Sequence, residues 1–259
     1  MMEAVWDLRS EKVAAELKEG RRLDARKVDE YRKIEIVREI SKNAEGSARV
    51  RLGSTEVVAG VKIFPDKPYP DAPDKGTISV GMELLALASP SFESGPPRDD
   101  SIELARVVDR GIRESQAVDF KNLCIREGEL CWIVFIDMYA LNDGGNLLDT
   151  CSMAALAALV DAKMPKLEDD KIVKGEHSGK LKIGCKPLLN TFAKIGSTVV
   201  LDPDTAEENA MSARFSLATV DEEYISAFQK GKGGSFTVAE LDMCIETAFK
   251  RGKELRKLF

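Results

Sequence analysis

The amino-acid sequence predicts an α+β fold in which helices pack on mixed β-sheets. Segments rich in Val and Ile alternate with helical segments in the order strands, helix, strands, helix, strands, helix. The connections between them are short, which favours stacked layers of sheet and helix. The composition, 44% hydrophobic and 32% charged, is that of an ordinary globular protein. Because 259 residues can bury a large core, we expect a single domain over residues 1–259.

The first half is expected to contain helices and strands joined by Pro-rich loops. A helix at 3–18 ends at Gly20, a residue that suits a helix C-terminus. Strands rich in Val and Ile are predicted at 33–40, 47–52 and 55–64. Loops at 65–73 and 89–97 follow, and Asp100 and Glu103 form a capping box for a helix that runs to about 116. Strands at 123–126 and 131–141 then lead to a glycine pair and an apolar helix at 149–163, which Pro165 ends.

The second half is predicted to begin with a polar linker at 166–178. Strands occupy 181–229, a turn covers 231–234, and Thr237 and Glu240 cap a last helix whose end at 250–257 is basic. Apolar residues recur in that helix every three to four positions and are expected to face the core: Val238, Leu241, Ile245, Phe249, Gly252, Leu255 and Phe259. The expected organisation is a helix at 1–19, a first half at 20–165 and a second half at 166–259.

Bulk properties exclude several classes of protein. The longest apolar run, 153–160, is too short to cross a bilayer, and residues 1–20 are charged, unlike a signal peptide. Five cysteines without a Cys-x-x-Cys pair suggest reduced core residues in a cytoplasmic protein. The single histidine, His177, leaves little basis for His-dependent catalysis or a metal site. We therefore expect no metal, no cofactor and no membrane contact. A net charge of −6 confines RNA binding to a local basic patch or to a surface shared with a partner.

The glycine pair marks a candidate phosphate-binding turn. A Gly-rich turn before a buried helix lets backbone N–H groups approach an anion, and the helix N-terminus adds partial positive charge. Here Gly144 and Gly145 are followed by Asn146 and Leu147, and no Ser, Thr, Lys or Arg occurs before Thr150. The turn is present, but the hydroxyl and the cation that normally complete such a site are missing.

The helix that starts near Asp100 carries three arginines on one face. Arg106, Arg110 and Arg113 have the spacing i, i+4 and i+7, so their guanidinium groups form a stripe. Such a stripe can bind successive phosphates, or it can pair with the helix's own acidic residues in a solvated network. Spacing alone favours the ion-pair network.

Five segments in order resemble the RNase PH family of phosphate-dependent 3′→5′ exoribonucleases: 20–26, 44–55, 103–110, 143–146 and 230–237. Ala25 departs from the pattern, because most relatives carry Gly there. Active members have Asp-Gly-Gly/Ala-Ser/Thr-Arg at the turn, where this chain has Asn146 and Leu147. The chain is therefore similar to the non-catalytic sister subunits of the archaeal exosome.

This resemblance implies a fold of two similar βαβα-type halves and a set of partners. The implied assembly is an alternating hetero-hexamer, with three copies each of this chain and a catalytic RNase PH-type subunit, together with S1/KH-type RNA-binding cap subunits. It implies that the ring degrades single-stranded RNA from the 3′ end with phosphate and adds tails from nucleoside diphosphates. The resemblance also assigns Arg106 and Arg110 to the RNA path, and Arg113 follows from its place on the same stripe.

Two alternatives remain open at this stage. Active relatives use a pair of carboxylates, which Asp202 and Glu208 match here, so the chain could be an active phosphorolytic exoribonuclease. Because a longer side chain displaces its carboxylate and the phosphate-holding Arg is missing, we expect these acids to lie in an acidic loop that is solvated or neighbours a partner. The chain could also be a purely structural ring component. Arg98 and the cluster of Arg21, Arg22 and Arg26 are left outside the predicted site, the cluster as structural or interfacial residues.

Overall fold

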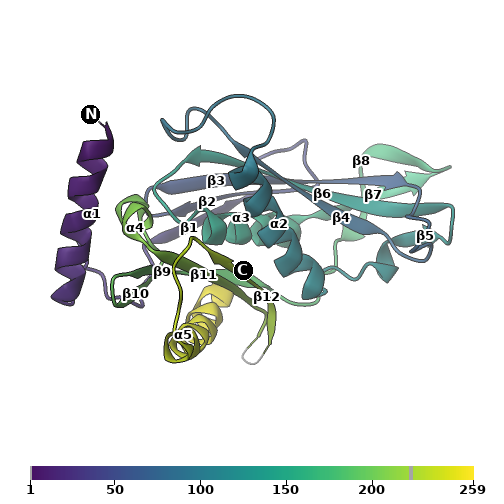
Figure 1. Cartoon of the computed structure of the whole chain (residues 1–259). Coiled ribbons are helices and arrows are strands. Elements are labelled where there is room, and N and C mark those ends of the chain that lie inside the picture. The colour runs from purple at the N-terminus through teal and green to yellow at the C-terminus, as the bar shows by residue number, and fades with distance from the viewer. Residues whose placement is uncertain (1, 222–223) are drawn as a thin grey trace.

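The computed structural model describes residues 2–221 and 224–259, with side chains from Arg9 onward within those ranges. Four layers are stacked in the order six-stranded sheet, helices α2 (Asp99–Glu114) and α3 (Leu147–Asp161), four-stranded sheet, helix α5 (Val238–Leu255) (Figure 1). The largest hydrophobic core lies around α3, between the two sheets, and a second core lies between the four-stranded sheet and α5. The α+β class predicted from the sequence is confirmed.

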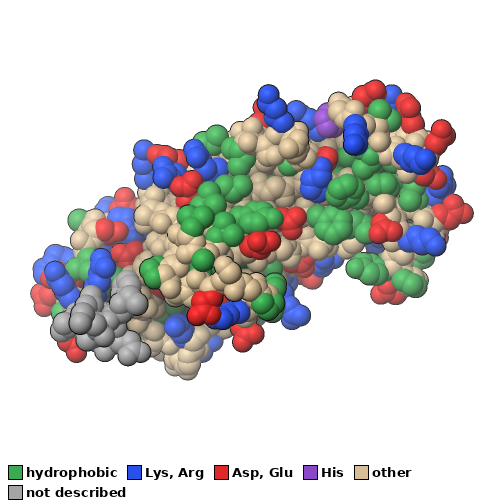
Figure 2. Space-filling view, turned by 90° about the horizontal axis from the view of Figure 1, so that it is seen from above, with side chains coloured by type: hydrophobic (Ala, Val, Ile, Leu, Met, Phe, Trp, Pro, Cys, Tyr) green, Lys and Arg blue, Asp and Glu red, His purple; other side chains and the backbone are tan. Residues whose placement is uncertain are grey.

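The six-stranded sheet has the order β1-β2-β3-β6-β4, with β5 paired to β6, and only β4 and β6 run parallel. Its strands are β1 Ile34–Arg38, β2 Gly46–Leu52, β3 Thr55–Asp66, β4 Thr77–Leu84, β5 Cys124–Arg126 and β6 Leu130–Asn142. Alternate residues of β3 are buried, as expected when one face packs on helices and the other is open. Figure 2 looks onto the open side from above and shows patches of hydrophobic side chains among charged ones. Strand β4 is not among the strands predicted from the sequence.

Two helices cover the inner face of this sheet. Helix α2 spans Asp99–Glu114 and helix α3 spans Leu147–Asp161. Helix α3 is buried on nearly every side. The capping box expected at Asp100 is wrong, because Arg98 is the N-cap of α2 and Glu103 instead pairs with Arg214. The predicted end of α3 at Pro165 is also wrong, since α3 ends at Asp161 and Pro165 lies in a strand.

The segment 166–178 is not a linker. Strands β7 Lys163–Glu168 and β8 Lys171–Lys180 form a two-stranded antiparallel hairpin. Lys166 forms ion pairs with Glu168 and with Glu176 across the hairpin. Since most of β8 is exposed, the hairpin has no hydrophobic pattern that would have revealed it.

The four-stranded sheet is antiparallel in the order β10-β9-β11-β12. Its strands are β9 Leu188–Ile195, β10 Thr198–Leu201, β11 Ala213–Thr219 and β12 Ile225–Gly231, with the unpredicted helix α4 Thr205–Ala210 between β10 and β11. Helix α5, Val238–Leu255, begins with the predicted Thr237–Glu240 capping box. Most of the predicted stripe faces inward, but Val238 is 76% exposed because it lies in the first turn, beyond the edge of the core.

Helix α1, Met2–Lys18, lies at one end of the molecule and packs on α4 through Val13 and Leu17 (Figure 1). The predicted cap at Gly20 is confirmed, since its φ is +73° and the Arg21 N–H donates to the Glu16 carbonyl. Short 3₁₀ turns cover Lys121–Leu123 and Arg256–Leu258. No helix in the described ranges is long and apolar enough to span a membrane.

Candidate functional site

The glycine turn is packed tightly between two other loops. A Cβ atom on Gly144 would lie 2.0 Å from the Ser54 hydroxyl oxygen, and one on Gly145 would lie 2.5 Å from the backbone of Asp204. Gly145 also has a φ of +89°, which favours glycine. The glycines are therefore required by the neighbouring protein segments, whether or not a ligand binds.

The backbone donors of this turn are already occupied. The Gly144 N–H donates to Thr55 Oγ1 at 3.2 Å, the Gly145 N–H to Asp143 Oδ1 at 3.0 Å, and the Asn146 N–H to Glu208 Oε1 at 2.9 Å. Asn146 has a left-handed conformation and caps α3 through the Asp149 N–H. The carboxylate of Glu208 thus takes one of the donors that a phosphate would use at this helix N-terminus.

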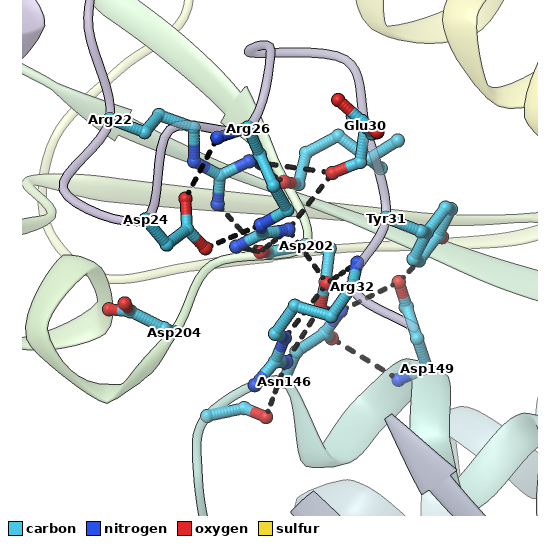
Figure 3. A network of polar contacts seen from close by, with 12 residues as sticks. Arg22, Asp24, Arg26, Glu30, Tyr31, Arg32, Asn146, Asp149, Asp202 and Asp204 are labelled. Carbon is cyan, nitrogen blue, oxygen red and sulfur yellow. Dashed lines mark hydrogen bonds and ion pairs between the residues drawn. The ribbon is translucent and has the colours of Figure 1, made fainter. Parts of the chain in front are cut away.

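Asp202 lies beside the turn and is fully buried, with a positive φ of +51°. One carboxylate oxygen is 2.7 Å from Arg32 Nη2 and 2.8 Å from Asn146 Nδ2, and the other is 2.9 Å from Arg26 Nη1 (Figure 3). Arg32 also donates to the carbonyls of Gly144 and Gly145. The expectation of a solvated acidic loop is wrong, because both oxygens of Asp202 are bound inside the protein.

A second buried carboxylate, Asp149 at the start of α3, joins three parts of the chain. It accepts hydrogen bonds from the Tyr31 hydroxyl, from Asn146 Nδ2, and from both the N–H and the hydroxyl of Thr191. Burial raises the pKa of Asp149, and these four donors oppose the rise. Tyr31, Arg32 and Asp149 are not among the residues predicted from the sequence. The bonds from Tyr31 to Asp149, from Thr191 to Asp149 and from Arg32 to Asp202 join residues 118, 42 and 170 positions apart.

A cavity of about 170 Å³ opens beside the turn. Its charged lining consists of Asp100, Glu103, Asp143, Glu208 and Arg214. Arg214 Nη2 is 2.5 Å from Glu103 Oε1, so the single cation is already paired. Burial raises the pKa of Glu208 to about 7, and nearby Asp143 adds to the rise. Four carboxyl groups and one paired arginine make a poor environment for phosphate. Within the described ranges, no group of three His, Cys, Asp or Glu side chains is placed to hold a metal ion.

The three arginines of α2 differ in their surroundings. Arg106 and Arg110 are exposed, and Arg110 reaches the Phe228 carbonyl at 3.4 Å. In the part of the chain that the structure describes, Arg106 forms no ion pair. Arg113 is half-buried, with its guanidinium 2.8 Å from Asp109 and 2.9 Å from the Ile78 carbonyl. The ion-pair network predicted from spacing is therefore present at Arg113 and absent at Arg106.

The remaining basic candidates have structural partners. Arg22 is buried and pairs with Glu207 at 2.6 Å, and Arg21 pairs with Glu16 at the surface. Arg98 pairs with Glu93 in the loop before α2. His177 is exposed on β8. The intramolecular partners of Arg22 agree with the structural interpretation of that cluster.

Comparisons with known proteins extend over nearly the whole chain. Residues 30–165 match domain 1 of the 3′ exoribonuclease family (RNase PH), and residues 187–251 match domain 2. Exosome complex component Rrp42 of Thermococcus gammatolerans is 48% identical over 246 residues, which cover 93% of this chain and 90% of that protein. A chain in a solved structure of the Archaeoglobus fulgidus exosome with RNA bound to the active site is 42% identical, with a TM-score of 0.94 and 99% of both chains covered. A chain of an archaeal exosome core is 40% identical, with a TM-score of 0.89 over 99% of this chain and 98% of the other.

The sequence motifs, the family models and the solved structures all indicate the same protein family. The predicted RNase PH-like fold is confirmed by the structural match, and the two family models together match most of the chain. This chain belongs to the RNase PH family of 3′ exoribonucleases.

Proposed function

We propose that this chain is a non-catalytic ring subunit of an archaeal-type exosome, located in the cytoplasm. The observation that carries the proposal is the occupied turn. All three N–H groups from Gly144 to Asn146 donate to acceptors of the chain itself. Leu147 stands at the position of the Arg in the Asp-Gly-Gly/Ala-Ser/Thr-Arg turn of active relatives.

Phosphorolysis requires inorganic phosphate to be held against the 3′ end of the RNA. At this turn phosphate would have to displace Glu208 from the Asn146 N–H and enter a cavity lined by Asp100, Glu103 and Asp143. Bringing an anion beside buried carboxylates is unfavourable without a compensating cation. The turn therefore has a structural role: it connects β6 to α3 and binds Glu208 of α4.

The proposed partner is a catalytic RNase PH-type subunit. Relatives are named exosome components, and a matching chain comes from an exosome with RNA bound to the active site. In the proposed ring, three copies of each subunit alternate, and S1/KH-type subunits cap one face. The exposed Arg106 and Arg110 contact phosphates of single-stranded RNA beside the active site of the sister. Arg113 follows on the same helix and is the last arginine of the proposed RNA-binding stripe. Its guanidinium group is held by an ion pair with Asp109.

The test compares the purified chain with a mixture of the chain and its catalytic sister. Single-stranded RNA, inorganic phosphate and Mg²⁺ are supplied, and released nucleoside diphosphates are measured. We expect no release from the chain alone and sustained release from the mixture. Glu208→Gln in this chain should leave the rate of the mixture unchanged, since Gln retains an oxygen acceptor for the Asn146 N–H. Release by the pure chain, abolished by Glu208→Gln, would instead establish it as an active phosphorolytic enzyme.

A further inference from the structure

Two of the five cysteines face each other across a pair of strands. Cys124 on β5 and Cys131 on β6 are direct partners in the antiparallel register. The Cα atoms of directly opposed residues in such a pair are about 4.5 to 5.5 Å apart. A disulfide requires about 4.4 to 6.8 Å between Cα atoms, so the spacing expected of such a pair falls within the range that a disulfide needs.

The two thiols also interact electrostatically, since Cys124 contributes to the raised pKa of Cys131. The Cys124 N–H donates to the Lys121 carbonyl at the end of the 3₁₀ turn. The register shifts between Cys124 and Arg126, so β5 departs from a regular ladder directly beside this pair. Cys124 therefore lies opposite Cys131 on a short, irregular strand.

We propose that Cys124 and Cys131 form a reversible cross-strand disulfide that links β5 to β6 under oxidising conditions. Both are free thiols in the structure. Strand β5 has three residues and pairs only with β6, so the bond would add a covalent link where backbone pairing is shortest. The hairpin they close also carries Arg126, which pairs with Asp170 in the β7–β8 hairpin.

The solvent exposure of the two thiols determines which of them reacts first. Cys124 is partly exposed, whereas Cys131 is buried, and burial raises the pKa of the Cys131 thiol with a further contribution from nearby Cys124. A peroxide therefore reacts first at Cys124, whose sulfur gains an oxygen as sulfenic acid while one water leaves. The Cys131 sulfur then attacks the Cys124 sulfur, the S–O bond breaks, and the released hydroxide takes the Cys131 proton as a second water. The two thiols lose two electrons, and the peroxide is reduced to water.

The other three cysteines provide internal controls. Cys151 is fully buried in α3 beside Met82, and Cys244 is fully buried in α5. Cys185 is partly exposed, but its thiol donates to the Ser115 carbonyl at 3.2 Å. Among the described residues, only Cys124 and Cys131 are paired across neighbouring strands.

The test treats the full chain with hydrogen peroxide at neutral pH and then alkylates it with iodoacetamide after denaturation. One disulfide removes two of the five thiols, so three cysteines should be labelled instead of five. Digestion after Lys and Arg should yield peptide 122–126, which contains Cys124, linked to peptide 127–163, in which Cys151 carries the label and Cys131 does not. Dithiothreitol should restore five labelled cysteines and reverse any rise in Tm that accompanies the bond.

Two variants make the result specific. Cys124→Ser, at the partly exposed position, should keep its remaining thiols unlinked, whereas Cys185→Ser should form the linked peptide as the wild type does. The proposal is overturned if peroxide leaves all five wild-type thiols unlinked, oxidises Cys124 without a cross-link, or joins other cysteines or separate chains.

Discussion

Glu208 illustrates how a single side chain changes the chemistry of the turn. Its carboxyl group accepts from the Asn146 N–H, next to the N-terminus of α3. At the same time it lies among Asp100, Glu103 and Asp143 around the cavity. One backbone hydrogen bond offsets only part of the cost of burying the charge, so the pKa of Glu208 rises from its ordinary value of 4.5 to about 7. The residue is thus an internal acceptor that is readily protonated.

This pKa makes stability depend on pH in a defined direction. Between pH 4.5 and about 7 the folded chain retains a proton at Glu208 that the unfolded chain has released. The free energy of unfolding therefore falls as pH rises through this window, by roughly 3 kcal/mol at most from this group. Glu208→Gln removes this contribution, so the variant should gain stability relative to the wild type on going from pH 4.5 to pH 8.

Urea unfolding of both proteins at several pH values measures the difference. Glu176→Gln on the exposed strand β8 is the matched control and should follow the wild-type curve. Parallel curves for the wild type and Glu208→Gln would show that the carboxyl group titrates as it does in the unfolded chain.

At the scale of secondary-structure elements, the close packing of α3 on β2 depends on one glycine. A Cβ atom on Gly46 would lie 2.2 Å from the Ala158 carbonyl oxygen and 2.7 Å from the Ala162 backbone. Those atoms belong to the end of α3, whose helix is buried on nearly every side and cannot shift freely. The small residues along α3 permit this close contact, and on β2 it requires the absence of a side chain at Gly46.

Gly46→Ala should therefore destabilise the protein by about 1–3 kcal/mol or more, the usual cost of overpacking a core. Gly60→Ala is the control, since that glycine lies on the neighbouring strand β3 and a Cβ atom there meets nothing within 4 Å. Thermal or chemical unfolding of both variants provides the measurement. Equal stability of the two variants would mean that the end of α3 relaxes away from β2.

At the scale of the whole molecule, the two faces differ in what they offer a partner. Helix α2 carries the exposed Arg106 and Arg110. The open face of the six-stranded sheet also has exposed arginines, Arg49 and Arg51, but both pair with Glu56. The proposed RNA path uses Arg106 and Arg110, because neighbouring carboxylates neutralise their positive charge less.

In the assembled ring, Arg106→Ala with Arg110→Ala should weaken RNA binding without dissolving the ring. Each lost phosphate contact should make the slope of log affinity against log salt shallower by about 0.7, the value for single strands. Binding measured across a salt series, with ring size checked by light scattering, tests this. Arg49→Ala with Arg51→Ala removes the same charge and should leave the slope unchanged. Equal slopes for both double variants would remove α2 from the RNA path, and a collapsed ring would make its arginines interface residues.

Much of the fold could be predicted because its signals are local. The Thr237–Glu240 box and the Gly20 cap depend on hydrogen bonds that span three to five residues, so the sequence alone shows them. The strands β2 and β3 follow from runs of Val and Ile. The hairpin at 163–180 could not be predicted, because most of β8 is exposed and is held to β7 by backbone pairing and by charge pairs such as Lys166 with Glu176.

For the candidate site, the amino-acid sequence is enough to show a glycine turn followed by Asn146 and Leu147, with no cation to hold phosphate. The groups that bind the N–H groups of this turn become visible only in the folded chain. Glu208 reaches Asn146 from 62 residues away, and Arg32 reaches Asp202 across 170 residues. Such contacts exist only after the sheets and α3 have packed, because packing brings distant groups together and removes the water that would otherwise solvate them. The residue types at the turn are therefore a property of the chain, whereas their partners and the pKa of Glu208 are properties of the fold.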